Sequence, residues 1–309
     1  MQLTVRAYQT EEDYWRIRAF QREVFLLNDR RELCWHVARL DYWRWHVIEN
    51  CNACEPVKDV TFIWETPDEQ MAAVLNPEGR GEAHLQVHPG RRTPELEEEM
   101  IVVAEQQLAG PGPDGQRALR VFADGRDTLR HDILLRRGYT QRGLSEHQWR
   151  RELDMPIPDV PVAPGYTVRS LGDTDELPTR SWASWRAFHL DEPDERYEGW
   201  EWYHNIQRMP LYRRDLDLVA VAPTGEIASF CTIWYDDVTR SAYYEPVGTT
   251  PEHQRRGLAK AILTEGLRRL KRMGATRAFV GGYEPEPNTL YTSVMGTEHD
   301  LSEPWMKKW

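Results

Sequence analysis

The sequence lacks three features that define large classes of proteins. It has no run of about 18 or more apolar residues, which excludes a membrane-spanning helix. With four cysteines in 309 residues, it is not a disulfide scaffold. The formal net charge is −11, whereas a protein that holds nucleic acid through its phosphates needs a basic surface. Residues 1–10 are typical of a strand and not of a secretory signal. We therefore expect a cytoplasmic protein that binds neither membranes nor nucleic acid.

What the sequence does contain indicates two globular domains. Hydrophobic residues make up 40% and charged residues 29%, as in ordinary folded proteins, and the length favours two domains over one. The clearest boundary is the stretch 154–165, DMPIPDVPVAPG, whose four prolines fix φ and remove hydrogen-bond donors. We predict an extended connector there, between domains at 1–153 and 166–309.

The two flanks of this connector share one order of elements. Each pattern begins with a strand, continues through helices to three strands, and then has a helix, a strand and a short helix. The first half ends on a further strand, whereas the second ends in a tail. The strands are predicted at Leu3–Tyr8, 59–65, 71–76, 82–88, 118–123 and 141–151, and at 166–170, 216–221, 227–235, 242–248 and 278–282. The helices of the first half include 11–27 and 34–47. This alternation predicts an α/β fold repeated twice.

The strongest helical pattern in the chain spans 256–273. Apolar residues recur there at helical spacing on one face. They are Leu258, Ile262, Leu263, Leu267 and Leu270. Gly274 follows directly and suits a left-handed cap at the end of the helix.

The segment that enters this helix has the chemistry of an anion site. Residues 245–259, EPVGTTPEHQRRGLA, leave a strand, form a loop and begin the helix, whose first N–H groups and dipole attract negative charge. Gly257 lacks a β-carbon, so a phosphate can approach the backbone closely. Arg255, Arg256 and Lys260 add positive charge. Together these features suit a pyrophosphate.

The residues from Gln254 to Ala259 fit the pattern Q/R-x-x-G-x-G/A and resemble the acetyl-CoA signature of the GNAT superfamily of N-acetyltransferases. The resemblance covers 243–275 and continues through 279–291. It implies tandem GNAT-like domains, each a mixed, mostly antiparallel sheet flanked by helices, whose fourth and fifth strands splay apart to admit pantetheine. The implied acetyl-CoA contacts are Val247, Gly248, Thr249, Gln254, Arg255, Arg256, Gly257, Leu258, Ala259, Lys260 and Asn288.

The resemblance also implies catalytic roles. The Val247 N–H would donate to the thioester oxygen, which becomes an oxyanion during attack, and Pro246 fits a bulge beside it. Because a free alkylamine has a pKa near 10, a base must help it lose a proton, and Glu245 is the first choice, with Glu284 as the second. Glu284 stands where the family usually has asparagine. Tyr291 matches the tyrosine that protonates the leaving thiolate of CoA.

The first half carries a degenerate form of the same segment at 87–97, VHPGRRTPELE. Arg92 corresponds to Gln254, but the two small-residue positions hold Glu95 and Glu97, which would repel a pyrophosphate. Leu134 replaces the tyrosine and has no proton to give. We therefore expect the first domain to be without cofactor, with a structural or substrate-shaping role.

Other motifs favour structural interpretations. A zinc site at Cys51 and Cys54 would need further ligands such as Cys34 with His36 or His46, and unpaired thiols are the simpler expectation, so no metal is predicted. His253 is expected to be a solvent-facing loop residue, and Glu95–Glu99 a solvated helix face. Trp305 and Trp309 are expected to cover an apolar surface, within the chain or in a dimer.

The leading hypothesis is an acyltransferase that moves an acetyl group directly from acetyl-CoA to a primary amine of a small molecule or peptide. The alternative is a non-catalytic acyl-CoA-binding sensor or interaction module. The sequence leaves the chain as a monomer or a homodimer. Its net negative charge favours a cationic acceptor through electrostatic steering.

Overall fold

The structure, a computed structural model, describes residues 2–112 and 114–309. Met1, the first residue of the predicted N-terminal segment, and residue 113 lie outside the described residues. The chain divides into two compact units. Unit 1 comprises Met1–Gln148 and Asp300–Trp309, and unit 2 comprises Trp149–His299. The division thus differs from the predicted boundary at 154–165, because residues 149–165 belong to unit 2 and the last ten residues to unit 1.

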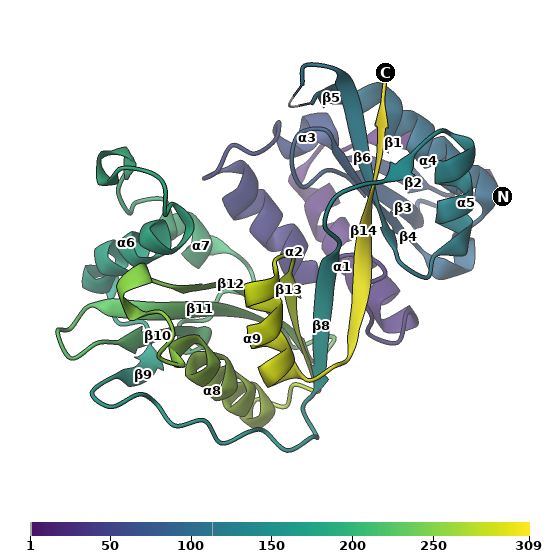
Figure 1. The fold of residues 1–309 in the computed structure, drawn as a ribbon. Helices are drawn as coiled ribbons and strands as arrows, with labels where there is room; N and C mark the ends of the chain where they lie inside the picture. The colour runs from purple at the N-terminus through teal and green to yellow at the C-terminus, as the bar shows by residue number, and fades with distance from the viewer. Residues whose placement is uncertain (1, 113) are drawn as a thin grey trace. The chain divides into compact units, whose positions relative to one another are not determined.

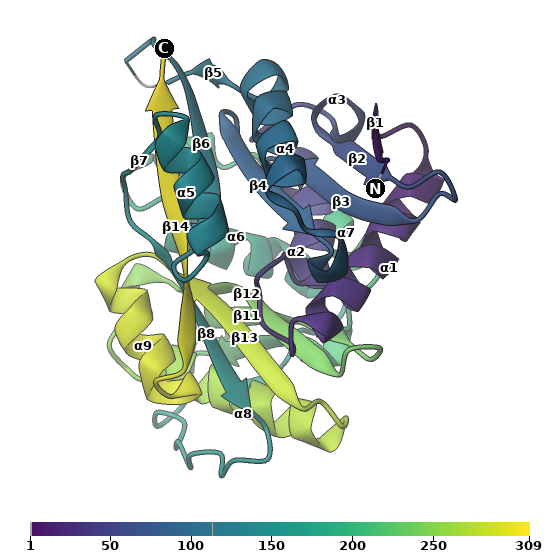
Figure 2. The ribbon, with the colours of Figure 1, turned by 90° about the vertical axis from the view of Figure 1, so that its right-hand side faces the viewer.

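Unit 1 is a sheet with helices packed on it. Its strands follow the order β1-β2-β3-β4-β6-β14, with the short strands β5 and β7 paired to β6 and β14. Figure 2 shows α4 and α5 in front of β4, β6 and β14. The elements are β1 (Thr4–Ala7), α1 (Glu11–Leu27), α2 (Val37–Tyr42), α3 (Val57–Val60), β2 (Phe62–Glu65), β3 (Met71–Asn76), β4 (Glu82–Val87), α4 (Pro94–Gln107), β5 (Gly110–Pro111), β6 (Arg117–Asp124), α5 (Thr128–Arg136), β7 (Thr140–Gln141) and β14 (His299–Lys308).

The C-terminal residues, predicted to be a tail, form the strand β14. It runs antiparallel to β6, with Ser302 opposite Asp124 and Lys308 opposite Ala118. Trp305 is 7% exposed and belongs to the hydrophobic core of unit 1, whereas Trp309 is 45% exposed. Trp305 therefore covers an apolar surface within the chain. The order of elements along the sequence assigned this strand to the wrong unit, because strand pairing is set by packing and not by chain order.

Unit 2 has strands in the order β8-β13-β12-β11-β10-β9. Figure 1 shows α6 and α7 on one face of these strands and α8 on the other. The elements are β8 (Glu146–Glu152), whose last residues lie in unit 2, β9 (Thr167–Ser170), α6 (Leu177–Phe188), α7 (Tyr203–Arg208), β10 (Asp217–Val221), β11 (Ile227–Asp236), β12 (Ser241–Thr249), α8 (Leu258–Arg272), β13 (Arg277–Gly282) and α9 (Pro285–Met295). Residues 154–165 form neither helix nor strand, as the prolines predicted.

Helix α8 confirms the strongest pattern in the sequence. The five apolar residues of its predicted stripe, from Leu258 to Leu270, are all at most 2% exposed. Burial of one such side chain stabilises a fold by about 1.5–3 kcal/mol, so this stripe fixes the helix against β10, β11 and β12. Gly274, the residue after the C-cap Met273, adopts φ +86°, as predicted for a left-handed cap. Among the described residues, no helix is both long and apolar enough to cross a membrane.

Three predictions in the first half of the sequence differ from the structure. The strand predicted at 141–151 is divided into β7 and β8. Two further elements begin later than expected. The helix predicted from Cys34 begins at Val37, because the Nδ1 of His36 accepts a hydrogen bond from the Ala38 N–H and caps it. A π-helical turn, Trp43–Ile48, follows. The strand predicted from residue 59 begins at Phe62, and the preceding residues form the single helical turn α3.

Candidate functional site

The site predicted in unit 2 begins at an irregular point in β12. Cys231 of β11 lies opposite Val247, but Ile233 lies opposite Tyr244, so one residue of β11 faces both Glu245 and Pro246. This is the bulge predicted at Pro246, which cannot donate a hydrogen bond to the ladder. The indole Nε1 of Trp234 donates to the Glu245 carbonyl oxygen over 2.6 Å and holds the bulge in place.

Beyond the bulge, β12 and β13 separate. They pair in parallel only from Ser241 to Tyr243, opposite Arg277 to Phe279. Strand β12 then continues to Thr249 and β13 to Gly282 without further pairing between them. The gap opens where pantetheine is expected to enter.

The loop after β12 ends at a glycine with a left-handed backbone. Gly257 has φ +75° and is the N-terminal cap of α8, and Arg255 also has a positive φ of +62°. A β-carbon at Gly257 would meet no atom within 4 Å. The residue is therefore glycine because of its backbone conformation, and the space above it is open. Such a helix start presents free N–H groups and a positive dipole end to a ligand.

Three cations surround this helix start without acidic partners. Within residues 2–112 and 114–309, neither Arg255 nor Lys260 lies within ion-pair distance of a carboxylate, and Arg256 donates only to the Glu252 carbonyl oxygen, over 3.4 Å. All three lie in a loop and first turn that have no capping side chain. Their uncompensated charge favours a bound anion.

His253 has a different environment from the one predicted. Its side chain is only 12% exposed, its Nδ1 lies 2.7 Å from the Tyr166 hydroxyl, and its Nε2 contacts Glu226. The prediction of a solvent-facing residue is therefore wrong. In the same loop Glu252 accepts from Arg186 of α6 over 2.6 Å. These contacts fix the loop that precedes α8.

Tyr291 lies on α9 beside the end of β13. It is 7% exposed, and a β-carbon on Gly282 would come within 3.0 Å of its ring. Burial, together with the negative charges that Cys231 and Glu245 would carry, raises the pKa of Tyr291. Among the described residues its hydroxyl makes no hydrogen bond. The side chain thus keeps its proton at neutral pH and has a free donor.

Asn288, predicted to contact acetyl-CoA, is already engaged within unit 2. Its Oδ1 accepts from the Trp149 indole over 2.8 Å, and its Nδ2 donates to the Tyr283 carbonyl oxygen over 3.2 Å. Trp149 was missed by the sequence reasoning, because nothing in a strand pattern says which helix a strand will contact. These bonds indicate a structural use of the Asn288 side chain.

The remaining predicted residues fall into the same region. Gly248 packs against Phe230, whose ring would lie 2.2 Å from an added β-carbon, so only glycine fits there. Thr249 shares a hydroxyl contact of 2.8 Å with Ser229, and its carbonyl oxygen accepts from Gln254 over 3.4 Å. The side chain of Leu258 is buried, so this residue and Ala259 can offer a ligand mainly their backbone. Glu284, the second candidate base, is exposed at the start of α9.

Unit 1 keeps the splayed strands but bridges the gap between them. Strands β4 and β6 pair only at Glu82 and Ala83. Further along, the guanidinium of Arg130 donates to the carbonyl oxygens of Leu85 in β4 and Phe122 in β6, each over 3.3 Å. A buried cation thus spans the gap that would admit pantetheine.

Glu97 holds this arginine in place. Its carboxylate accepts from Arg130 over 2.8 and 2.9 Å and from Arg92 over 2.6 Å, while Arg92 also contacts Asp127 over 2.5 Å. Burial opposes ionisation of Glu97, but the two guanidinium groups outweigh it and lower its pKa. Glu97 is 0% exposed, so the prediction that 95–99 forms a solvated face is wrong at this residue. The negative charge of Glu97 is balanced by Arg92 and Arg130, and the carboxylate does not contact solvent.

The start of α4 in unit 1 is also capped by a side chain, that of Thr93. The loop before α4 covers residues 88–93 and is two residues shorter than the corresponding loop, 250–257. Thr93 caps α4 by accepting from the Leu96 N–H over 3.2 Å. Leu134 occupies the seventh position of α5, as Tyr291 does in α9, and is buried.

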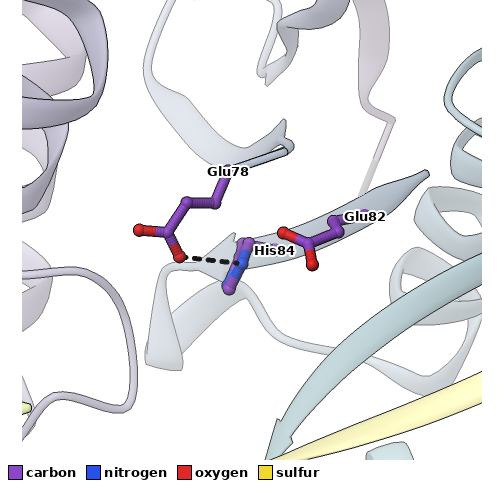
Figure 3. A group of neighbouring side chains, drawn as sticks. All are labelled: Glu78, Glu82 and His84. Atoms are coloured by element: carbon purple, nitrogen blue, oxygen red, sulfur yellow. Dashed lines mark ion pairs between the residues drawn. The ribbon is translucent and has the colours of Figure 1, made fainter. Parts of the chain in front are cut away.

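Three side chains of unit 1 form a group with the composition of a metal site. Glu78, Glu82 and His84 bring their ligand atoms within 4.8 Å of one another (Figure 3). However, the Nδ1 of His84 accepts from the Trp35 indole over 3.2 Å, which leaves the proton of the neutral ring on Nε2, the nitrogen that lies 3.9 Å from Glu78. Glu82 is neutralised by Arg120 over 2.8 Å. These contacts disfavour a metal ion there.

The zinc ligands considered for the C-x-x-C segment do not form a group among residues 2–112 and 114–309. Cys51 is exposed and Cys54 is buried, and both are free thiols. Cys34 is buried elsewhere, where its sulfur accepts from the Val87 N–H over 3.3 Å. His36 caps α2.

Comparison with known proteins agrees with this geometry. Residues 176–289 match the model of the acetyltransferase (GNAT) family. No curated protein sequence matches the chain. A tandem GNAT protein from the clavulanic acid biosynthesis pathway, solved without AcCoA, has a TM-score of 0.67 at 14% identity, with 99% of this chain and 98% of that chain covered.

Two further solved structures cover almost the whole chain. A GCN5-related N-acetyltransferase from Sphaerobacter thermophilus gives a TM-score of 0.66 at 19% identity, covering 99% of this chain and 95% of that chain. An acetyltransferase of the GNAT family from Colwellia psychrerythraea gives 0.62 at 11% identity, covering 98% and 100%. The chain therefore has the fold of the tandem GNAT proteins, and its residues 176–289 match the GNAT family model.

Proposed function

We propose that the protein is a cytoplasmic acetyl-CoA-dependent N-acetyltransferase with one active site, in unit 2. The proposal is carried by the Tyr291 hydroxyl, which keeps its proton and makes no hydrogen bond among the described residues. It lies beside strands β12 and β13, which splay apart. The uncompensated cations at Arg255 and Lys260 support a pyrophosphate site at the start of α8. Four free cysteines support a reducing compartment.

The proposed reaction is a direct transfer in a ternary complex. The nitrogen of a primary amine forms a bond to the thioester carbonyl carbon, and the Val247 N–H donates to the oxygen, which takes the negative charge of the tetrahedral intermediate. Glu245 accepts a proton from the amine, directly or through water. The C–S bond then breaks, and the CoA sulfur takes the proton of Tyr291.

The acceptor is proposed to be a cationic small molecule or peptide. The connection between α6 and α7 exposes the carboxylates of Asp191, Asp194, Glu195, Glu198 and Glu201. Helix α6 packs on β11 and β12, the strands that carry the bulge. A negative surface beside the site would raise the local concentration of a cationic amine, and the net charge of −11 acts in the same direction.

Tyr291→Phe tests the proposed chemistry because it removes one hydroxyl and little volume. Loss of a general acid should lower kcat about hundredfold, within the range known for acid–base catalysis. Acetyl-CoA affinity, measured by calorimetry, should change by less than about twofold, since the hydroxyl acts only on the leaving group. Tyr235→Phe is the matched control, because the Tyr235 hydroxyl lies 3.4 Å from the Met273 carbonyl oxygen, away from the proposed chemistry. Its kcat and its acetyl-CoA affinity should both stay unchanged.

The same pair of measurements tests the alternative, an acyl-CoA-binding sensor. A sensor would bind acetyl-CoA with normal saturation but transfer no acetyl group to any amine of a broad panel. Initial rates measured at varied concentrations of amine and acetyl-CoA should give intersecting lines in a double-reciprocal plot if the transfer is direct. Parallel lines would contradict a ternary complex and indicate an acetylated enzyme.

A further inference from the structure

The last strand of the first half of the sequence contacts α9 at two points. Trp149 and Arg151 are two residues apart in β8 and therefore point to the same face of the strand. Trp149 donates to Asn288 in the first turns of α9, over 2.8 Å. Arg151 donates to the carbonyl oxygens of Val294 and Met295 in the last turn, over 3.1 and 3.4 Å.

The Trp149 contact lies one helical turn from the proposed acid. Asn288 and Tyr291 are three residues apart and share a face of α9. Both touch the position of Gly282, where a β-carbon would come within 2.6 Å of the Asn288 Oδ1 and 3.0 Å of the Tyr291 ring. Trp149 is 6% exposed, and its bond to Asn288 is partly buried. Asn288 and Tyr291 thus both lie on the side of α9 that faces the end of β13.

The Arg151 contact fixes the other end of the helix. The last carbonyl groups of a helix have no partners within it, and a cation placed there also interacts favourably with the helix dipole. Arg151 is 8% exposed, and its Nη2 also donates to the Pro156 carbonyl oxygen over 2.5 Å. Its guanidinium joins the end of α9 to the start of the connector. Both ends of the helix that carries Tyr291 thus depend on side chains of β8.

We infer that Trp149 and Arg151 are positioning residues that hold α9, and through it Tyr291, in the geometry for proton transfer to the leaving thiolate. This inference rests on the proposed function of unit 2. It means that the active unit begins before the connector, at β8, and that residues 166–309 do not contain everything the site needs. The first half of the chain would then contribute to catalysis by supplying this strand.

The test uses Trp149→Phe and Arg151→Met in the full-length chain. Each should lower kcat roughly tenfold, because misplacement of a reacting group by a fraction of an ångström to 1 Å has large effects on rate. The KM for acetyl-CoA and its calorimetric affinity should stay within about twofold. Arg150→Met is the matched control: Arg150 points to the opposite face of β8, and its guanidinium lies 3.4 Å from the exposed Glu298.

A second set of variants separates positioning from general damage. In a Tyr291→Phe background, Trp149→Phe should cause no further loss of kcat, because the proton it helps to place is already gone. Equal losses in both backgrounds would overturn the inference, as would an unchanged kcat in the wild-type background. Arg151→Lys should recover part of the rate lost in Arg151→Met, and it carries the test if Trp149→Phe fails to fold.

Failure of the inference is distinguishable from failure of the proposed function. No acetyl transfer by the unaltered protein, or no effect of Tyr291→Phe, would overturn the proposed function and this inference with it. Transfer that depends on Tyr291 but not on Trp149 or Arg151 would overturn the inference alone.

Discussion

The two units treat the same junction of strand, loop and helix in opposite ways. In unit 2 the N-cap of α8 is Gly257, and a β-carbon there would meet no atom within 4 Å. The cations around this helix start have no acidic partners among the described residues. In unit 1 the loop is shorter, Thr93 caps the helix, and Arg130 with Glu97 fills the gap between the strands. Unit 1 therefore keeps the splayed strands of the repeated fold but places an internal ion pair in the gap between them.

Removal of that ion pair should have the largest effect on unit 1. Arg130→Met leaves the buried carboxylate of Glu97 with a single partner, and loss of one member of a buried pair costs about 3–5 kcal/mol. Urea unfolding should show this loss. Acetyl-CoA binding, which is proposed for unit 2, should not change. The double variant Glu97→Gln with Arg130→Met should recover much of the stability, because no buried charge remains unpaired.

A cost below about 1 kcal/mol for Arg130→Met would contradict the structural role of this pair. A new acetyl-CoA site in the double variant would contradict the comparison in another way. It would show that the ion pair alone keeps unit 1 silent, and that the short loop and the Thr93 cap do not matter.

The closed cleft of unit 1 should also make stability depend on pH. Glu32 lines a small cavity beside Leu85 and Phe122, and burial raises its pKa to about 8 from an ordinary 4.5. The folded state therefore keeps a proton that the unfolded state releases. The stability that comes from keeping Glu32 protonated is complete below about pH 4.5. It is lost as the pH rises to 8, at up to about 1.4 kcal/mol per pH unit.

Glu32→Gln should remove this slope. Urea midpoints measured between pH 5.5 and 8 should fall for the parent protein and stay flatter for the variant, which should be the more stable of the two at pH 8. An identical slope in both proteins would show that Glu32 ionises normally and that its surroundings are wetter than the structure indicates.

The cations of unit 2 should have a smaller effect, on affinity only. Arg255→Ala and Lys260→Ala should each weaken acetyl-CoA binding roughly five- to tenfold at low ionic strength, with smaller losses in high salt because exposed charges are screened. Arg91→Ala, in the corresponding loop of unit 1, should leave the acetyl-CoA affinity unchanged. Equal losses from Arg91→Ala and Arg255→Ala would contradict the assignment of the pyrophosphate to unit 2.

Local patterns in the sequence predicted the parts of unit 2 that local chemistry determines. The stripe from Leu258 to Leu270, the cap at Gly274 and the bulge at Pro246 follow from periodicity, backbone freedom and a missing N–H, and all three are confirmed. The similarity of the two halves also appeared in the order of elements. The catalytic and cofactor roles of the predicted residues remain proposals.

Contacts between distant parts of the chain do not follow from the local sequence. The local sequence predicts a solvated Glu97, because its partner Arg130 lies 33 residues further on, in another helix. Strand β14 joins β6, far back in the sequence, and Trp149 meets Asn288 across the connector. Each depends on the tertiary arrangement, which residue spacing does not report.

The proposal that unit 2 binds acetyl-CoA and unit 1 does not is tested most directly by calorimetry. Acetyl-CoA is titrated into the full-length protein and, for comparison, into the Gly257→Glu variant. Gly225→Glu is the matched control, since Gly225 also has a positive φ, +92°, and open space, but lies in the β10–β11 hairpin. We expect saturation near one equivalent per chain, abolished in Gly257→Glu and kept in Gly225→Glu. Two equivalents, no binding, or binding that survives Gly257→Glu would contradict the proposal.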